Sequence, residues 1–203
     1  MRIAVVSEGS SDIGMIGDAG HRGAVRVLVE RLLGNPQGVE FTGRRLPVLH
    51  GRGGLKKKVK LGIQASHMRK EDGVVIVVDN DCRPPAERRK ALSGAKDEAQ
   101  VPIPVALGLA VQMMEAWLVA DENAVGAVIG DRKSVKKTRD PEKITDPKRV
   151  LNDMANRRLT GRELEKIAMC LDIDVVVSRC KKGFGRFDKE LKSNLGRLCN
   201  AGT

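Results

Sequence analysis

The chain has 203 residues, of which 41% are hydrophobic, so it is long and apolar enough to fold around one main α/β core. Lysine and arginine outnumber aspartate and glutamate by 37 to 26, and the resulting net charge of +11 favours polyanionic partners such as nucleic acid. The four cysteines form no CxxC pair, which argues against a structural zinc site. Because no apolar run is long enough for a membrane span and the first predicted strand begins at Arg2, we expect no membrane insertion, no signal peptide and a cytoplasmic location.

Two continuous runs of apolar, mostly β-branched residues, at 2–7 and 73–79, predict buried parallel strands. After the first run, apolar residues at helical spacing predict a helix over about 25–32, and a second strand is expected within 39–48. A further helix is predicted over 55–66, with apolar residues on one face and lysines on the other.

Pro84 and Pro85 favour the first turn of another helix that runs to about Ala99, and residues 103–107 predict a fourth strand. Strands and helices therefore alternate. With right-handed crossovers, this order predicts a mostly parallel four-stranded sheet flanked by helices, in which ligands bind at the carboxyl ends of the strands.

Beyond residue 112 the apolar spacing becomes mainly helical, which predicts an α/β domain over 1–111 and a helical extension packed on it over 112–203. Residues 131–149 are predicted to form a charged connection that contains proline. Residues 172–178 fit either a strand or part of a helix, and their periodicity does not decide between the two.

Acidic residues follow both of the continuous apolar runs. Glu8 and Gly9 come directly after the first run, and the second run ends in Asp79, with Asn80 and Asp81 next in the chain. Hard divalent cations prefer carboxylate oxygens, and two aspartates at positions i and i+2 can reach one ion where the backbone turns. An Asp-rich turn after a strand explains the DxD spacing about equally well, but the Glu-Gly pair at the end of the other strand favours a metal site.

These motifs resemble the TOPRIM domain, which topoisomerases, primases, small ribonucleases and OLD-type nucleases share. That family has a Glu-Gly after its first strand, matched here at Glu8, and a DxD after its third strand, matched at Asp79 to Asp81, over about residues 1–110. The SEGSSD stretch, with Asp12 four residues beyond Glu8, is most similar to the OLD-type version. The MEAWLVAD and HGRGG segments resemble small stand-alone TOPRIM proteins. The implied fold is a TOPRIM or Rossmann-like α/β domain.

The resemblance implies a Mg²⁺ or Mn²⁺ site in which Glu8, Asp79 and Asp81 hold the metal and, with Glu115, form the catalytic group. Asp12 and Glu115 would contribute to a second ion. A surface or capping role for Glu115 is an equal alternative, and Asp12 would point into solvent if its loop is open. OLD-type relatives often work beside an ATPase. Because this chain has no GxxxxGK[ST] motif, a partner would have to supply that activity, and a role in defence against phage rests on the same analogy.

Several relatives are excluded on chemical grounds. The topoisomerases of this family attack DNA with a tyrosine hydroxyl, and this chain contains no tyrosine. The primase and recombination-mediator relatives carry zinc modules, whose Cys and His spacing does not occur here. The HAD phosphatases also use a DxD motif, but theirs follows the first strand, whereas this one follows the third.

A basic segment lies between Glu40 and Glu71, where nine lysines and arginines occur without an acidic residue. We expect part of it to contact the phosphates of nucleic acid, and a solvated helix face that only aids solubility is the alternative. The predicted contact residues are Arg52, Lys56, Lys57, Lys58 and Lys60. Lys181 or Lys182, near the C-terminus, is a candidate cation for stabilising the transition state.

The sequence therefore favours metal-dependent hydrolysis of phosphodiester bonds in DNA or RNA. Two alternatives stay open. A nuclease that matures structured RNA would share the chemistry but not the substrate. A non-catalytic subunit that binds nucleic acid or regulates a partner would use the metal only to organise its loops.

Overall fold

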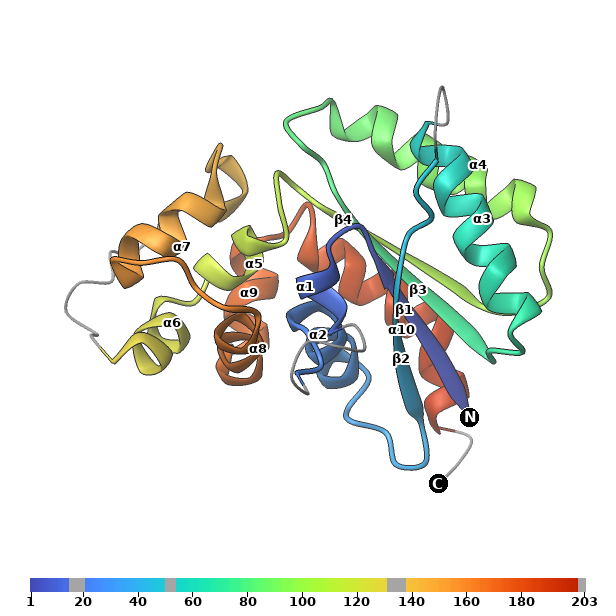
Figure 1. The fold of residues 1–203 in the computed structure, drawn as a ribbon, viewed down its shortest axis with the longest axis horizontal. Helices are drawn as coiled ribbons and strands as arrows, with labels where there is room; N and C mark the ends of the chain where they lie inside the picture. Colours follow the sequence, from blue (N-terminus) through green and yellow to red (C-terminus); the bar gives the residue numbers. More distant parts are fainter. Residues whose placement is uncertain (15–20, 50–53, 131–137, 201–203) are drawn as a thin grey trace.

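Four parallel strands form a single sheet in the order β2-β1-β3-β4 (Figure 1). They are β1 (Arg2–Ser7), β2 (Glu40–Arg45), β3 (Gly73–Asp79) and β4 (Val105–Ala110). The structure is a computed structural model, and it describes residues 1–14, 21–49, 54–130 and 138–200. All three strand pairings are parallel, which confirms the predicted α/β class and four-stranded sheet.

Helices cover both faces of the sheet because side chains of the central strands alternate between two apolar layers (Figure 1). Val75 and Val77 of β3 belong to the layer that contains α2 (Ala24–Leu32) and α10 (Phe184–Asn200). The alternate residues of β3 belong to the opposite layer, with α3 (Leu55–Met68) and α4 (Pro85–Ala99). Burial on both faces explains why β1 and β3 are continuous apolar runs in the sequence.

The C-terminal helices share the core of the sheet and add a helical region at one side of it (Figure 1). Trp117 links the two parts: its ring lies 5.1 Å from Phe184 in an edge contact and 5.7 Å from Phe187 in a stacked contact. The elements of this region, besides α10, are α5 (Glu115–Val119), α6 (Glu122–Ile129), the 3₁₀ helix η1 (Pro141–Lys143), α7 (Pro147–Ala155), α8 (Gly161–Cys170) and α9 (Ile173–Arg179).

The structure corrects the bounds of the fourth strand and shows that residues 172–178 are helical. The fourth strand was predicted over 103–107 but runs from Val105 to Ala110, because Pro104 lacks the N–H that parallel pairing needs and the apolar residues continue to position 110. Residues 172–178, left undecided above, are helical: the Asp172 side chain caps α9 by accepting hydrogen bonds from the main-chain N–H groups of Asp174 and Val175.

None of the helices in the described ranges is long and apolar enough to cross a membrane. Of the charged connection predicted over 131–149, residues 131–137 lie outside the described part of the chain, and η1 and the start of α7 lie within the rest.

Candidate functional site

Acidic side chains from three parts of the chain meet at the carboxyl ends of the strands. Asp79 is the last residue of β3, Asp12 lies in α1 (Ser10–Ile13), which follows β1, and Glu115 begins α5 after β4. Parallel strands bring these three connections to one edge of the sheet.

Asp79 is at the centre of this acidic group. Its Oδ1 accepts a hydrogen bond from the main-chain N–H of Met114 at 2.8 Å. Burial, followed by the charges of Asp12 and Glu115, raises its pKa from 3.8 to about 8, and Asp81 adds a smaller effect. The carboxyl group of Asp79 is therefore mostly protonated at neutral pH when no cation is bound.

Asp12 is positioned by its immediate neighbours. Its Oδ2 accepts a hydrogen bond from the Ser7 hydroxyl at 2.9 Å. A Cβ atom at Gly9 would lie only 2.5 Å from the same oxygen, so the Asp12 carboxylate occupies space that glycine alone leaves open. The glycine after Glu8 thus has a direct role in placing Asp12.

Glu115 is buried, with 8% of its surface exposed. Burial is the main cause that raises its pKa, and the charge of Asp12 adds to it, while Lys148 acts in the opposite direction. This burial departs from the alternative of a surface glutamate on an amphipathic helix.

Asp81 belongs to the same edge but is held differently. It has a left-handed backbone (φ +48°), its side chain is half exposed, and its Oδ2 forms an ion pair with Arg88 Nη2 at 2.8 Å. The intervening Asn80 is buried, and its main-chain N–H donates to the carbonyl oxygens of Ala110 and Gln112. The side-chain oxygens of Asn80 and Gln112 are buried and accept no hydrogen bond from the described residues.

Glu8 is the first acid after β1. Its side chain is half-buried, and its main-chain carbonyl accepts a hydrogen bond from Arg45 Nε at 3.1 Å. Of the two acids that follow β1, Asp12 is the one whose charge raises the pKa of both Asp79 and Glu115.

The predicted phosphate contacts lie at the start of α3, except Arg52, which is outside the described residues. Lys57 is exposed and Lys58 is half-buried. Lys56 forms an ion pair with Glu98 at 2.6 Å, and Lys60 lies 3.8 Å from the other oxygen of the same carboxylate. Glu98, on α4, therefore offsets part of the positive charge of this face.

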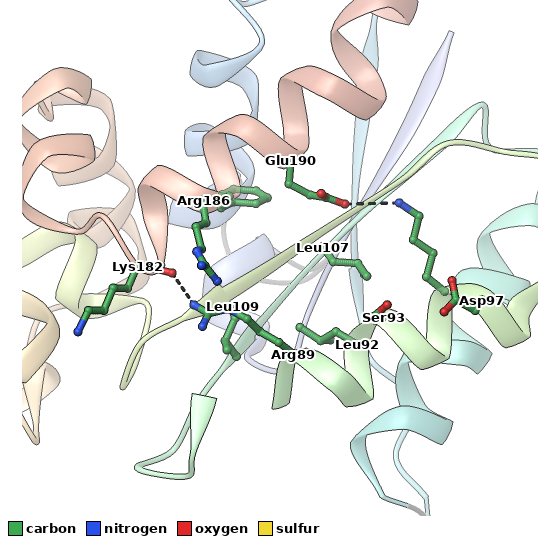
Figure 2. Close-up of a pocket in the computed structure, with 12 residues that line it drawn as sticks. Arg89, Leu92, Ser93, Asp97, Leu107, Leu109, Lys182, Arg186 and Glu190 are labelled. Atoms are coloured by element: carbon green, nitrogen blue, oxygen red, sulfur yellow. Dashed lines mark hydrogen bonds and ion pairs between the residues drawn. The ribbon is translucent and has the colours of Figure 1, made fainter. Parts of the chain in front are cut away.

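Lys181 and Lys182 are both exposed and lie just before α10. The main-chain N–H groups of Lys182 and Gly183 donate to the buried carboxylate of Glu142. Figure 2 shows the Lys182 side chain pointing away from the neighbouring arginines Arg89 and Arg186.

Ser7, Arg88 and Glu98 were not selected from the sequence. Ser7 lies directly before the Glu-Gly pair, and its position at the end of a buried strand is a signal that could have pointed to it. Arg88 and Glu98 have no comparable signal in the sequence. A turn separates Arg88 from its partner Asp81, and strand β3 lies between Glu98 and its partner Lys56.

The donor set fits a hard divalent cation in its chemistry but is not preassembled. The acids supply oxygen ligands, and the pKa of Asp79 is raised first by burial and then by neighbouring carboxylates, whose repulsion a cation would relieve. Within the described ranges, however, no three Asp, Glu, His or Cys side chains are gathered closely enough to hold an ion as they stand. Binding would therefore require these side chains to converge.

Comparison of the chain with protein-family models, with curated proteins and with solved structures finds no match in any of the three.

Proposed function

We propose that this chain is a TOPRIM-like, Mg²⁺- or Mn²⁺-dependent phosphodiesterase that hydrolyses DNA or RNA. The observation that carries the proposal is the convergence of Asp12, Asp79 and Glu115 from three separate connections. Burial is the main cause that raises the pKa of Asp79 to about 8, and the charges of Asp12 and Glu115 are close enough to add to it. Such crowding costs stability and is typical of functional sites.

Each residue has a distinct role in this proposal. Asp79 and Asp12 would be the central ligands, and the Met114 N–H and the Ser7 hydroxyl would orient their carboxylates. Glu115 would complete the site from α5. Bound Mg²⁺ or Mn²⁺ would supply positive charge opposite the scissile phosphate.

Asp81 and Glu8 would join the same site as outer ligands. Asp81 would have to leave Arg88, and that arginine would then be available to a phosphate group of the substrate. The net charge of +11 supports a polyanionic substrate, and the lysines at the start of α3 would contact its backbone. An ATPase partner and a role in phage defence remain part of the proposal by family analogy alone.

A non-catalytic subunit that binds nucleic acid or regulates a partner is the second candidate. Two observations favour it: the described acids do not form a ready three-ligand group, and Asp81 is already paired with Arg88. In that case a cation would organise the loops without hydrolysis.

The proposal is tested first by Mn²⁺ binding, because the substrate is unknown. Since Asp79 must lose its proton, Mn²⁺ affinity should fall about tenfold for each pH unit below pH 8, and calorimetry in buffers of different ionisation heat should detect one released proton. Affinity that stays constant between about pH 6 and 8 would show that metal binding displaces no proton from Asp79, and Asp79→Asn with unchanged Mn²⁺ affinity would remove Asp79 from the site.

Activity is then tested on single-stranded, duplex and nicked DNA and on structured RNA, each with Mg²⁺ or Mn²⁺. Asp79→Asn should abolish cleavage. Asp153→Asn is the matched control, because Asp153 is an exposed residue of α7 outside the acidic group. Mn²⁺ binding by the unsubstituted chain without cleavage of any substrate would favour the non-catalytic candidate.

A further inference from the structure

A pocket of about 420 Å³ lies beside the free edge of β4, between α4 and α10 (Figure 2). Apolar side chains from all three elements line part of it: Leu92, Leu107, Leu109 and Phe187. The pocket has the size of a small-molecule site and combines this apolar surface with a few charged groups.

Two arginines dominate the charge of the pocket. Arg89 of α4 and Arg186 of α10 extend toward each other across it (Figure 2). Arg89 donates a hydrogen bond to the Lys182 carbonyl, and within the described part of the chain neither guanidinium forms an ion pair with a carboxylate. Burial and the nearby charge of Arg186 both lower the pKa of Arg89.

The acids that line the pocket or lie near it form no ion pair with these arginines among the described residues. Glu190 lies 3.4 Å from Lys96, and Asp97 is on the far side of Ser93 from the two arginines (Figure 2). The charge of Glu142 raises the pKa of Arg89, which opposes the effect of Arg186. The Glu142 carboxylate accepts hydrogen bonds from the main-chain N–H groups of Lys182 and Gly183, which precede α10. The two guanidinium groups are therefore left facing the pocket without a direct anionic partner.

We propose that this pocket binds a phosphate monoester, such as the terminal phosphate of a nucleic-acid strand or the phosphate of a free nucleotide. A monoester carries about −1.5 to −2 charges at pH 7, which matches two guanidinium groups better than the single charge of a phosphodiester does. Arginine can donate two parallel hydrogen bonds to phosphate oxygens, and the leucines would pack against the attached sugar or base.

Strand β4 lines the pocket and pairs with β3, which ends in Asp79, and the inference deepens the proposed function, on which it rests. Leu109, which lines the pocket, pairs with Val78 in the sheet, and the next pair joins Ala110 to Asp79. Neighbouring strands lie about 4.8 Å apart. A strand whose terminal phosphate is held by Arg89 and Arg186 and that extends over the carboxyl ends of β4 and β3 would pass the acidic group, which would direct hydrolysis toward strand ends.

The test measures binding in EDTA, so that it does not depend on the metal site. The probes are AMP, adenosine, inorganic phosphate, and a short single-stranded DNA with either a 5′-phosphate or a 5′-hydroxyl. We expect AMP to bind at least tenfold more tightly than adenosine and the phosphorylated DNA at least tenfold more tightly than its hydroxyl form. A larger gain in affinity from the 5′-phosphate of the DNA than from the phosphate of AMP would identify the strand end as the source of the phosphate, and the reverse order would identify a free nucleotide.

Arg186→Gln and Arg89→Gln should each weaken monoester binding about tenfold. Lys189→Gln and Lys90→Gln are matched controls, because each removes one positive charge from an exposed position of the same helix, and both should leave the affinity within about twofold. Arg186 is exposed, so its substitution tests the pocket even if Arg89→Gln disturbs the packing of α4.

Equal affinity for the phosphorylated and hydroxyl forms, together with equal affinity for AMP and adenosine, would overturn the inference. So would arginine variants that behave like the lysine controls. Asp79→Asn should bind AMP as the unsubstituted chain does, so loss of cleavage with retained AMP binding separates the proposed nuclease activity from the pocket.

Discussion

Asp79 Oδ1 accepts a hydrogen bond from the main-chain N–H of Met114 at 2.8 Å, and this bond ties the end of β3 to the residue before α5. Because Glu115 is the next residue, the same contact holds the half-buried Asp79 close to the buried Glu115. The fold thus positions charge repulsion at the carboxyl ends of the strands, where it destabilises the chain without a bound cation and favours the chain with one.

The first prediction concerns the pH dependence of stability. The pKa of Asp79 is 3.8 in its ordinary state and about 8 in the fold, so the folded chain binds more protons than the unfolded chain between these values. The free energy of unfolding should therefore fall as the pH rises from about 4 to 8. Asp79→Asn keeps an oxygen for the Met114 N–H and should raise the free energy of unfolding at pH 8 by about 2 kcal/mol, since partial exposure reduces the effect.

Urea denaturation in EDTA at pH 5 and pH 8 measures this difference. The gain from Asp79→Asn should be much smaller at pH 5, where Asp79 is protonated in the folded chain. Asp153→Asn, on the exposed surface of α7, should change neither value appreciably. A gain of the same size at both pH values would show that Asp79 is not the group that titrates.

The second prediction tests whether Asp81 belongs to the metal site. Arg88 holds the Asp81 carboxylate at 2.8 Å and would compete with a cation for it. Arg88→Gln should therefore raise Mn²⁺ affinity about threefold to tenfold, the size expected for loss of one partly exposed ion pair. Isothermal calorimetry of Mn²⁺ binding measures the change.

Arg149→Gln serves as the control for this measurement, because Arg149 forms an exposed ion pair with Asp153. Unfolding curves of both variants would confirm that the fold is retained. If Arg88→Gln leaves Mn²⁺ affinity at the value of the control, Asp81 is a partner of Arg88 alone and not a ligand.

The strands and the edge of the sheet that carries the acids could be predicted from the sequence because both depend on local patterns. Burial on two faces makes β1 and β3 continuous apolar runs, and parallel pairing places the residues that follow them together. The acids after these runs, Asp12 and Asp79, were accordingly found at one edge.

Which of these acids interact most closely could not be predicted, because this depends on contacts between distant parts of the chain. The role of Asp12 follows from the Ser7 hydroxyl and from the space over Gly9, and neither is visible as a spacing. Similarly, the sequence gives the helical period of residues 184–198 but not that Phe187 stacks on Trp117 and brings α10 onto the sheet. The pocket between α4 and α10 is lined by this same Phe187, so it could not be predicted either.

The last prediction concerns the lysines at the start of α3. Glu98 pairs with Lys56 at 2.6 Å and lies 3.8 Å from Lys60, and the hydrogen bond from Lys56 is the main cause that lowers the Glu98 pKa. Glu98→Gln should free both lysines for phosphate contacts. Nucleic acid should then bind more tightly regardless of its sequence, and the slope of log affinity against log salt should steepen by about 0.9 for each new duplex contact.

Fluorescence anisotropy of a labelled duplex over a range of salt concentrations measures both quantities. Glu87→Gln is the matched control, because it removes one negative charge from an exposed position of the same helix without touching the α3 lysines. Lys56→Gln should have the opposite effect from Glu98→Gln, since it removes a contact instead of releasing one. If Glu98→Gln and Glu87→Gln alter affinity and slope equally, only net charge matters and the start of α3 is a solvated face that nucleic acid does not contact.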